Sequence, residues 1–269
     1  MKRVKLVAHR GYSKFYPENT LISFKEALKL DIDAIETDVH MTRDGELVLM
    51  HDHTLERTTD MRGLIRDTLF SEVRRADAGR WKDEKFKGAE VPTLRELLEL
   101  LKDRKDIELI VEMKDYPADC GAFGYLSCDK TVAMLEEYGM AERCYINSAS
   151  GDILNYVSAK FPQYRIEGFS PVRLHGEQFS EGLWRKCFSV CLFNISFDPV
   201  TGAKDNSKAG TVPPQSAYDR VAAQGAERWY YYKEDVEEML KTALERGATG
   251  FTSNDPVRCN ELLRKLGAR

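Results

Sequence analysis

The first fifth of the chain carries four short motifs whose side chains could together act on a phosphate ester. They are His9-Arg10-Gly11, Pro17-Glu18-Asn19-Thr20, Glu36-Thr37-Asp38 and His51-Asp52. Carboxylates can bind a divalent cation, an arginine can bind two phosphate oxygens at once, and histidines can exchange a proton near neutral pH. These are the groups needed on the two sides of a scissile P–O bond. The motifs therefore predict a site that cleaves phosphate esters with the help of a metal.

The motifs lie at the ends of segments that we expect to be β-strands. Short apolar runs alternate with longer segments of helical period, a pattern typical of β-α units around a parallel sheet. We expect strands at residues 4–9, 34–39, 108–114, 144–147, 165–169, 190–195, 228–232 and 250–253. We expect helices at residues 20–30, 93–102, 129–138, 152–161, 181–187, 216–224, 233–246 and 256–266. Eight strands, each followed by a helix, predict an α/β protein with the (β/α)8 TIM-barrel fold.

Helix signals support this organisation, and two regions interrupt it. Asn19 and Thr20 are candidate caps for the first helix, and Gly247 stands where the seventh should end. Residues 54–92 are expected to form a small inserted subdomain after the second strand, and residues 197–214, rich in Gly, Asp, Lys and Pro, a long mobile loop. We expect residues 1–269 to form a single catalytic barrel domain.

Catalytic residues of such a barrel come from the carboxyl ends of its strands. The first three predicted strands end with His9 and Arg10, with Glu36 and Asp38, and with Glu112 and Lys114. Because side chains alternate along a strand, Glu36 and Asp38 point the same way, with Cα atoms about 7 Å apart. Three carboxylates at a barrel mouth repel one another unless a cation lies between them. Ligation by oxygen alone favours Mg²⁺, Ca²⁺ or Mn²⁺ over zinc.

Composition excludes several classes of protein. The chain has 269 residues, of which 42% are hydrophobic and 31% charged, as in a globular protein with a core. Its net charge of -4 gives no global field for nucleic acid or an anionic membrane. Polar residues come too early for a signal peptide and no apolar run could span a bilayer, so we expect a cytoplasmic protein without stable membrane insertion. The six cysteines lack metal-binding spacing and are expected to be reduced, structural thiols.

The motifs above, together with Asp44-Gly45 and Val111-Glu112-Met113-Lys114, resemble the glycerophosphodiester phosphodiesterase family. The resemblance implies a TIM barrel with a small insertion after the second strand. It also implies hydrolysis of glycerophosphodiesters, which are deacylated phospholipid headgroups, to glycerol 3-phosphate and an alcohol. The small-molecule diester would then be the substrate, and the low net charge predicts no nucleic-acid partner.

The same resemblance implies roles for individual residues. Glu36, Asp38 and Glu112 would bind a divalent metal, Mg²⁺ or Ca²⁺; His9 and His51 would act as general acid and base; Arg10 and Lys114 would bind the phosphate. Glu18 and Asn19 are further candidates for substrate or phosphate binding. For Glu18 the alternative is to orient Arg10, and for Asn19 it is to cap a helix. His40 is a candidate supporting residue, and His53 is expected to be a loop residue.

The resemblance weakens after residue 114. Trp229-Tyr230-Tyr231-Tyr232-Lys233 and Ser253-Asn254-Asp255-Pro256 stand where the family usually has a Trp-Thr-Val-Asn-like segment and Thr-Asp-x-Pro. These elements would lie on the side of the leaving alcohol. There, Phe193, Tyr231 and Tyr232 could form an aromatic wall or could simply pack the barrel.

Two other functions fit the same motifs. One is a lysophospholipase D or sphingomyelinase D-like phosphodiesterase with the same fold. The other is a non-catalytic barrel that binds phosphodiesters. The presence of Glu112 on the third predicted strand and the lack of a signal peptide favour the glycerophosphodiester substrate.

Overall fold

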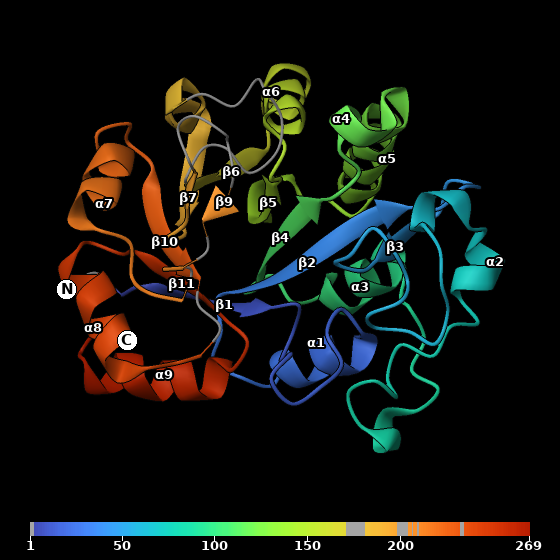
Figure 1. Cartoon of the computed structure of the whole chain (residues 1–269), viewed down its shortest axis with the longest axis horizontal. Helices are drawn as coiled ribbons and strands as arrows, with labels where there is room; N and C mark the ends of the chain where they lie inside the picture. The colour runs from blue at the N-terminus through green and yellow to red at the C-terminus, as the bar shows by residue number, and fades with distance from the viewer. Residues whose placement is uncertain (1–2, 171–180, 198–203, 206, 209, 232–233) are drawn as a thin grey trace.

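A closed barrel of parallel strands forms the centre of the computed structural model, which describes residues 3–170, 181–197, 204–205, 207–208, 210–231 and 234–269 (Figure 1). The barrel strands are β1 (Lys5–His9), β2 (Ala34–Met41), β4 (Glu108–Met113), β5 (Cys144–Asn147), β6 (Arg165–Ser170), β7 (Cys187–Leu192), β10 (Glu227–Tyr231) and β11 (Gly250–Ser253). β1 pairs in parallel with both β2 and β11, and this pairing closes the sheet. The predicted (β/α)8 barrel is confirmed.

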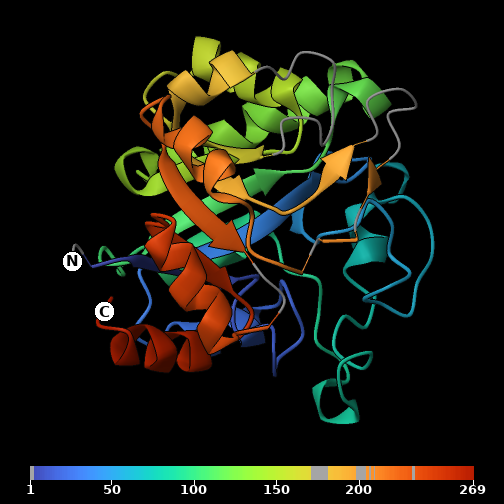
Figure 2. The same cartoon turned by 60° about the vertical axis from the view of Figure 1, so that its left-hand side comes forward.

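Helices surround the barrel on its outer face, as Figures 1 and 2 show from two sides. The longer ones are α1 (Leu21–Ala27), α3 (Leu94–Leu101), α5 (Ala122–Glu137), α6 (Gly151–Lys160), α7 (Gln215–Ala222), α8 (Glu237–Glu245) and α9 (Pro256–Lys265). Short 3-10 helices precede two strands: η3 (Ala141–Arg143) precedes β5 and η4 (Glu181–Lys186) precedes β7. None of the helices in these described ranges is long and apolar enough to cross a bilayer.

Helix α3 shows how the sequence specifies these elements. Its leucines at positions 94, 97, 98 and 101 are all buried, which is the spacing of one helix face. Thr93 caps the first turn: its hydroxyl accepts from the backbone N–H of Glu96, and the Glu96 carboxylate accepts from the N–H of Thr93. Each buried leucine contributes about 1.5–3 kcal/mol relative to an exposed one.

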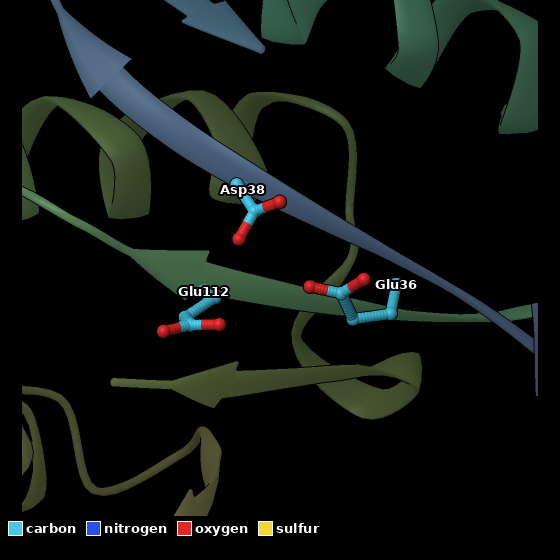
Figure 3. A group of neighbouring side chains, drawn as sticks. All are labelled: Glu36, Asp38 and Glu112. Atoms are coloured by element: carbon cyan, nitrogen blue, oxygen red, sulfur yellow. The ribbon is translucent and has the colours of Figure 1, made fainter. Parts of the chain in front are cut away.

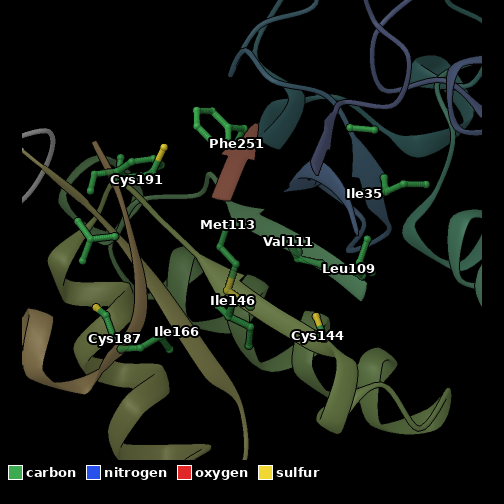
Figure 4. Packing of buried hydrophobic residues seen from close by; sticks show 14 of the residues in the cluster. Ile35, Leu109, Val111, Met113, Cys144, Ile146, Ile166, Cys187, Cys191 and Phe251 are labelled. Carbon is green, nitrogen blue, oxygen red and sulfur yellow. The ribbon is translucent and has the colours of Figure 1, made fainter. Parts of the chain in front are cut away.

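The main hydrophobic core lies between the barrel strands and the helices. Figure 4 shows part of it, in which Ile35, Val111, Ile146 and Ile166 come from four neighbouring strands. All six cysteines are free, and five of them are buried, as expected for structural thiols.

A second apolar layer fills the inside of the barrel at its amino-terminal end. It comprises Val7, Ala34, Ile110, Tyr145 and Trp229, with Phe188 packed against them. Gly250 makes room for this layer, because a Cβ at that position would lie 2.7 Å from the indole of Trp229. The barrel is therefore filled at this end, and its free interior lies toward the carboxyl ends of the strands.

Several elements differ from the sequence prediction. The strand β3 (Leu47–Leu49), antiparallel to β2 after the Asp44-Gly45 turn, was not predicted because it is only three residues long. The prediction that a helix begins at residue 129 was wrong, since α5 begins at Ala122 after the short α4 (Pro117–Cys120). Apolar residues on more than one face of α5, including exposed Leu126, hide its period.

Two further boundaries needed correction. The predicted strand at 190–195 is β7, which begins at Cys187 because this residue pairs with Ile166 on β6. Thr20 caps α1 through its hydroxyl, so the prediction that Asn19 also caps it was wrong. Tyr232 and Lys233, predicted as the end of a strand and the start of a helix, lie outside the described residues.

The region 54–92 packs beside β3 and contains η1 (Ile65–Asp67), α2 (Phe70–Val73) and η2 (Glu84–Phe86). Its buried apolar residues form a separate hydrophobic cluster together with two residues at β3, Val48 and Met50; the other members are Leu55, Ile65, Val73, Ala76, Ala78 and Val91. In the predicted loop 197–214, β8 (Ser196–Phe197) and β9 (Lys204–Asp205) form a small antiparallel pair. Residues 198–203, 206 and 209 of that loop lie outside the described part of the chain.

Candidate active site

A cavity of about 580 Å³ opens at the carboxyl ends of the barrel strands. Six of the predicted site residues line it: His9, Arg10, Glu36, His51, Glu112 and Lys114. Asp38 is fully buried beside it. The predicted residues thus come together from three strands and one loop at the place where TIM barrels carry their active sites.

Three carboxylates converge at the bottom of this cavity. Glu36 and Asp38 come from β2 and Glu112 from β4, and one oxygen of each lies within 4.8 Å of the others (Figure 3). Burial, and then the charge of Asp38, raise the pKa of Glu36 well above its usual value. The Oδ1 atom of Asp38 is buried and has an ionic contact with Lys114 but no well-aligned hydrogen bond. A set of mutually repelling, buried carboxylate oxygens fits a hard divalent cation.

Two basic side chains compensate part of this negative charge. The Nζ atom of Lys114 lies 2.6 Å from Glu112 Oε1 and 3.1 Å from Asp38 Oδ1. The Nε atom of Arg10 lies 3.1 Å from Asp38 Oδ2. Burial alone would raise the pKa of Asp38, but Lys114 and Arg10 hold it well below its usual range. Both cations line the cavity, where their remaining N–H groups can meet an anion.

His9 is held by a residue from the opposite end of the chain. Its Nδ1 lies 2.6 Å from Oδ1 of Asn254, which places the ring proton on Nδ1. The other nitrogen, Nε2, faces Glu36 at 3.8 Å. Burial, with a further contribution from Arg10, lowers the pKa of His9 to about 3. His9 is therefore a neutral imidazole with one nitrogen free to accept a proton.

His51 is oriented by its neighbour in the sequence. Its Nδ1 lies 2.6 Å from Oδ1 of Asp52, and the other carboxylate oxygen of Asp52 accepts from Nε of Arg57 at 2.6 Å. Burial opposes ionisation of Asp52, but the hydrogen bonds from His51 and Arg57 lower its pKa. A carboxylate in this position orients the ring.

Arg57 also connects the two halves of the site. It donates through Nη2 to Oε1 of Glu18 at 2.8 Å, and the same oxygen accepts from Nη1 of Arg10 at 2.8 Å. Burial opposes the charge of Glu18, but Arg57 and Arg10 lower its pKa to about 2. Glu18 is not among the residues that line the cavity. It contacts the site through its ion pair with Arg10. An unbroken set of ion pairs thus links His51 to Arg10.

We expect Arg57→Lys to lower kcat by about 10- to 100-fold, in the range typical of residues that support a site from behind. A guanidinium can bind two carboxylates at fixed angles, whereas an ammonium cannot. Steady-state kinetics would measure the loss, with Arg62→Lys as control because Arg62 is exposed in the same region. An unchanged kcat for Arg57→Lys would contradict the link.

Two site residues have strained backbones. Arg10 and Asn19 have φ angles of 55° and 56° and are the only residues other than glycine with positive φ in the described ranges. Such a conformation costs about 1–3 kcal/mol for each residue. It is stabilised by hydrogen bonds: the N–H of Arg10 donates to the carbonyl of Glu36, and the N–H of Asn19 donates to the carbonyl of Arg10. The strain places Arg10 against Asp38.

Asn19 contacts a carboxylate rather than the cavity. Its Nδ2 donates to Oδ2 of Asp38 at 2.8 Å, and its Oδ1 accepts from the hydroxyl of Thr37 at 2.8 Å. The structure therefore places Asn19 behind Asp38, as a residue that positions it. His40 is buried and pairs with Asp115, with Nδ1 2.8 Å from Oδ1.

Aromatic side chains form one side of the cavity. Phe193 lies 5.9 Å from Tyr231 and 5.5 Å from Phe169, between ring centroids, and all three line the cavity. Tyr231 also packs against His9 at 4.5 Å. Of the predicted aromatic wall, Phe193 and Tyr231 are therefore in place, and Tyr232 lies outside the described residues.

Sequence reasoning assigned no role to several residues of the site. Asn254 and Arg57 act through contacts that are distant in sequence, and no local pattern marks them. His53 lines the cavity and packs edge-to-face against Tyr116, with ring centroids 5.3 Å apart. Asn147, Glu167 and Phe169 also line it. Side chains alternate along a strand, so their positions near the carboxyl ends of β5 and β6 could have indicated that these three side chains point into the barrel.

Comparisons with known proteins agree with this geometry. Residues 9–258 match the glycerophosphoryl diester phosphodiesterase family. A glycerophosphodiester phosphodiesterase of Caldanaerobacter subterraneus subsp. tengcongensis is 35% identical over 97% of this chain and 98% of its own length.

Solved structures show the same fold. A glycerophosphodiester phosphodiesterase from Agrobacterium tumefaciens has a TM-score of 0.73 at 25% identity, over 96% of this chain and 99% of its own. An Oleispira antarctica phosphodiesterase, in complex with the product sn-glycerol-3-phosphate, has a TM-score of 0.79 at 23% identity, over 97% of each chain.

Proposed function

Since the chain belongs to the glycerophosphoryl diester phosphodiesterase family and is a phosphoric diester hydrolase, we propose that it hydrolyses glycerophosphodiesters with a divalent metal and a histidine acid/base pair. The products would be glycerol 3-phosphate and an alcohol. The observation that carries this proposal is one cavity with three converging carboxylates and two oriented histidines. We also propose that residues 1–269 act as one catalytic unit, to which the region 54–92 contributes Arg57.

The carboxylate triad would hold the metal. Glu36, Asp38 and Glu112 offer only oxygen, so Mg²⁺ and Ca²⁺ both suit them. Such a cation, when bound, would supply Lewis-acid polarisation of a phosphoryl oxygen. Arg10 and Lys114 would bind the remaining phosphoryl oxygens and stabilise the charge that develops on them. Their contacts with Asp38 and Glu112 fix them at the edge of the triad.

The two histidines would move the protons. His9, neutral and with its Nε2 3.8 Å from Glu36, would take the proton from the substrate's 2-hydroxyl as that oxygen attacks phosphorus. The cyclic phosphate formed in this step would then be opened by water to give glycerol 3-phosphate. His51, whose ring Asp52 orients, would give a proton to the leaving alcohol. Asn254 and Asp52 would keep each ring in the tautomer that its role requires.

A substrate panel tests the proposed function. We expect release of glycerol 3-phosphate from glycerophosphocholine and from other glycerophosphodiesters, and only when a divalent cation is present. Lysophosphatidylcholine should be a poor substrate in the same assay. Preference for the acylated compound would instead indicate a lysophospholipase D or sphingomyelinase D-like activity. No metal-dependent hydrolysis of any diester would indicate a barrel that only binds phosphodiesters.

A further inference from the structure

A pair of buried polar residues, Asn147 and Glu167, lies in the same cavity but takes no part in the mechanism above. Asn147 is the register neighbour of Glu112 across β4 and β5, and Glu167 is the neighbour of Asn147 across β5 and β6. Ser189 on β7 continues the row. The row of polar residues therefore extends from the carboxylate triad around the inside of the barrel, over three further strands.

The contacts of Glu167 are unusual for a buried carboxyl group. It accepts from Nδ2 of Asn147 at 2.6 Å and from the hydroxyl of Ser189 at 2.7 Å. No basic side chain pairs with it among the described residues, and burial raises its pKa to about 7. An apolar side chain would be less costly in a barrel interior, because a buried carboxyl group must be desolvated. A buried carboxyl group that lines the cavity without a basic partner is a candidate for a function there.

Asn147 presents an unused acceptor beside this carboxyl group. The residue is 3% exposed, and its Oδ1 is buried without a hydrogen-bond partner. Leaving such an atom unpaired costs about 1–3 kcal/mol. Together, Asn147 Oδ1 and the Glu167 oxygens form a surface of hydrogen-bond acceptors close to Glu112. Such a surface repels a phosphate group and suits a neutral group that donates hydrogen bonds.

We propose that Asn147 and Glu167 form a subsite for an alcohol hydroxyl group of the substrate, carried either by its glycerol moiety or by its leaving alcohol. The hydroxyl would donate to a Glu167 oxygen or to Asn147 Oδ1, and so satisfy the buried acceptors when the phosphate lies at the triad. This inference rests on the proposed function, since it assigns a binding site to a further group of the same diester substrate.

The test compares kcat/KM within two pairs of diesters, and the members of each pair differ only in hydroxyl groups. Glycerophosphoethanol and its propane-1,2-diol analogue differ in the terminal glycerol hydroxyl; glycerophosphoglycerol and glycerophosphopropanol differ in the hydroxyls of the leaving alcohol. In the wild-type enzyme, one of these pairs should favour the hydroxylated member by about 10- to 100-fold, as expected for a hydrogen bond to a carboxyl group. The pair that does so identifies the source of the hydroxyl.

Glu167→Leu should abolish this preference. It should lower kcat/KM for the hydroxylated member by about 10- to 100-fold and leave the deoxy member nearly unchanged. Glu167→Gln should keep part of the preference, because its amide oxygen still accepts. Ser189→Ala is the matched control: it removes a hydrogen bond to Glu167 on the side of β7 and should preserve the preference.

Three results would overturn the subsite. These are an equal loss on all four substrates in both Glu167 variants, an unchanged preference in Glu167→Leu, or a loss confined to glycerophosphocholine, which would assign Glu167 to a cationic group. Failure of the proposed function looks different, because the wild-type enzyme would then hydrolyse none of these diesters. In that case the subsite is refuted together with the function.

Discussion

Replacing His9 or His51 by alanine is expected to lower kcat by about 10²- to 10⁴-fold, the usual contribution of a positioned proton donor or acceptor. Each ring has one nitrogen fixed by a partner, Asn254 or Asp52, and the other nitrogen available to the substrate. Steady-state release of glycerol 3-phosphate would measure the loss. Neither ring belongs to the carboxylate triad, so binding of the cation should survive in both variants.

Stabilisation by the cation therefore serves as the internal control. The midpoint of thermal unfolding should rise on addition of Mg²⁺ or Ca²⁺ in His9→Ala and His51→Ala as it does in the wild type. His53→Ala provides a comparison within the same loop, and we expect a smaller loss, because no carboxylate fixes that ring. Near-normal turnover in His9→Ala or His51→Ala would refute the role given to that histidine.

Removal of the metal, or of one carboxylate that holds it, is the second change with a large expected effect. Chelation should lower turnover by at least about 10²-fold, since a bound cation contributes several kcal/mol to stabilisation of the transition state. Activity should return when Mg²⁺ or Ca²⁺ is restored. Glu36→Gln should show the same loss of turnover even when Mg²⁺ or Ca²⁺ is present.

The stability of Glu36→Gln separates a metal site from an ordinary acidic cluster. Burial and the charge of Asp38 already disfavour the ionised form of Glu36, so without metal the variant should unfold at no lower temperature than the wild type. It should, however, gain little from added cation, because one ligand has lost its charge. Glu238→Gln, on the exposed face of α8, should behave as the wild type does. Full cation-dependent stabilisation of Glu36→Gln would contradict the assignment.

The barrel and the clustering of its motifs could be predicted because both follow from local rules. The strands at 144–147 and 250–253 have the predicted bounds, since short apolar runs between helical segments mark them clearly. Glu36, Asp38 and Glu112 converge because alternation turns them inward at the ends of adjacent strands.

The remaining parts of the site depend on contacts that no local pattern contains. The partner of His9 is Asn254, which the closing pairing of β1 with β11 brings to it from the other end of the chain. Arg57 lies in an inserted region without a clear period, and its two carboxylate partners become evident only in three dimensions. The start of α5 was missed for a related reason, because that helix has apolar side chains on more than one face.

The apolar layer at the amino-terminal end of the barrel has a consequence for the order of events in a catalytic cycle. Because Ile110, Tyr145 and Trp229 fill the interior there, the described strands offer no exit on that side. Substrate, water and both products then share one entrance. Either product at high concentration should therefore compete with new substrate for the same passage.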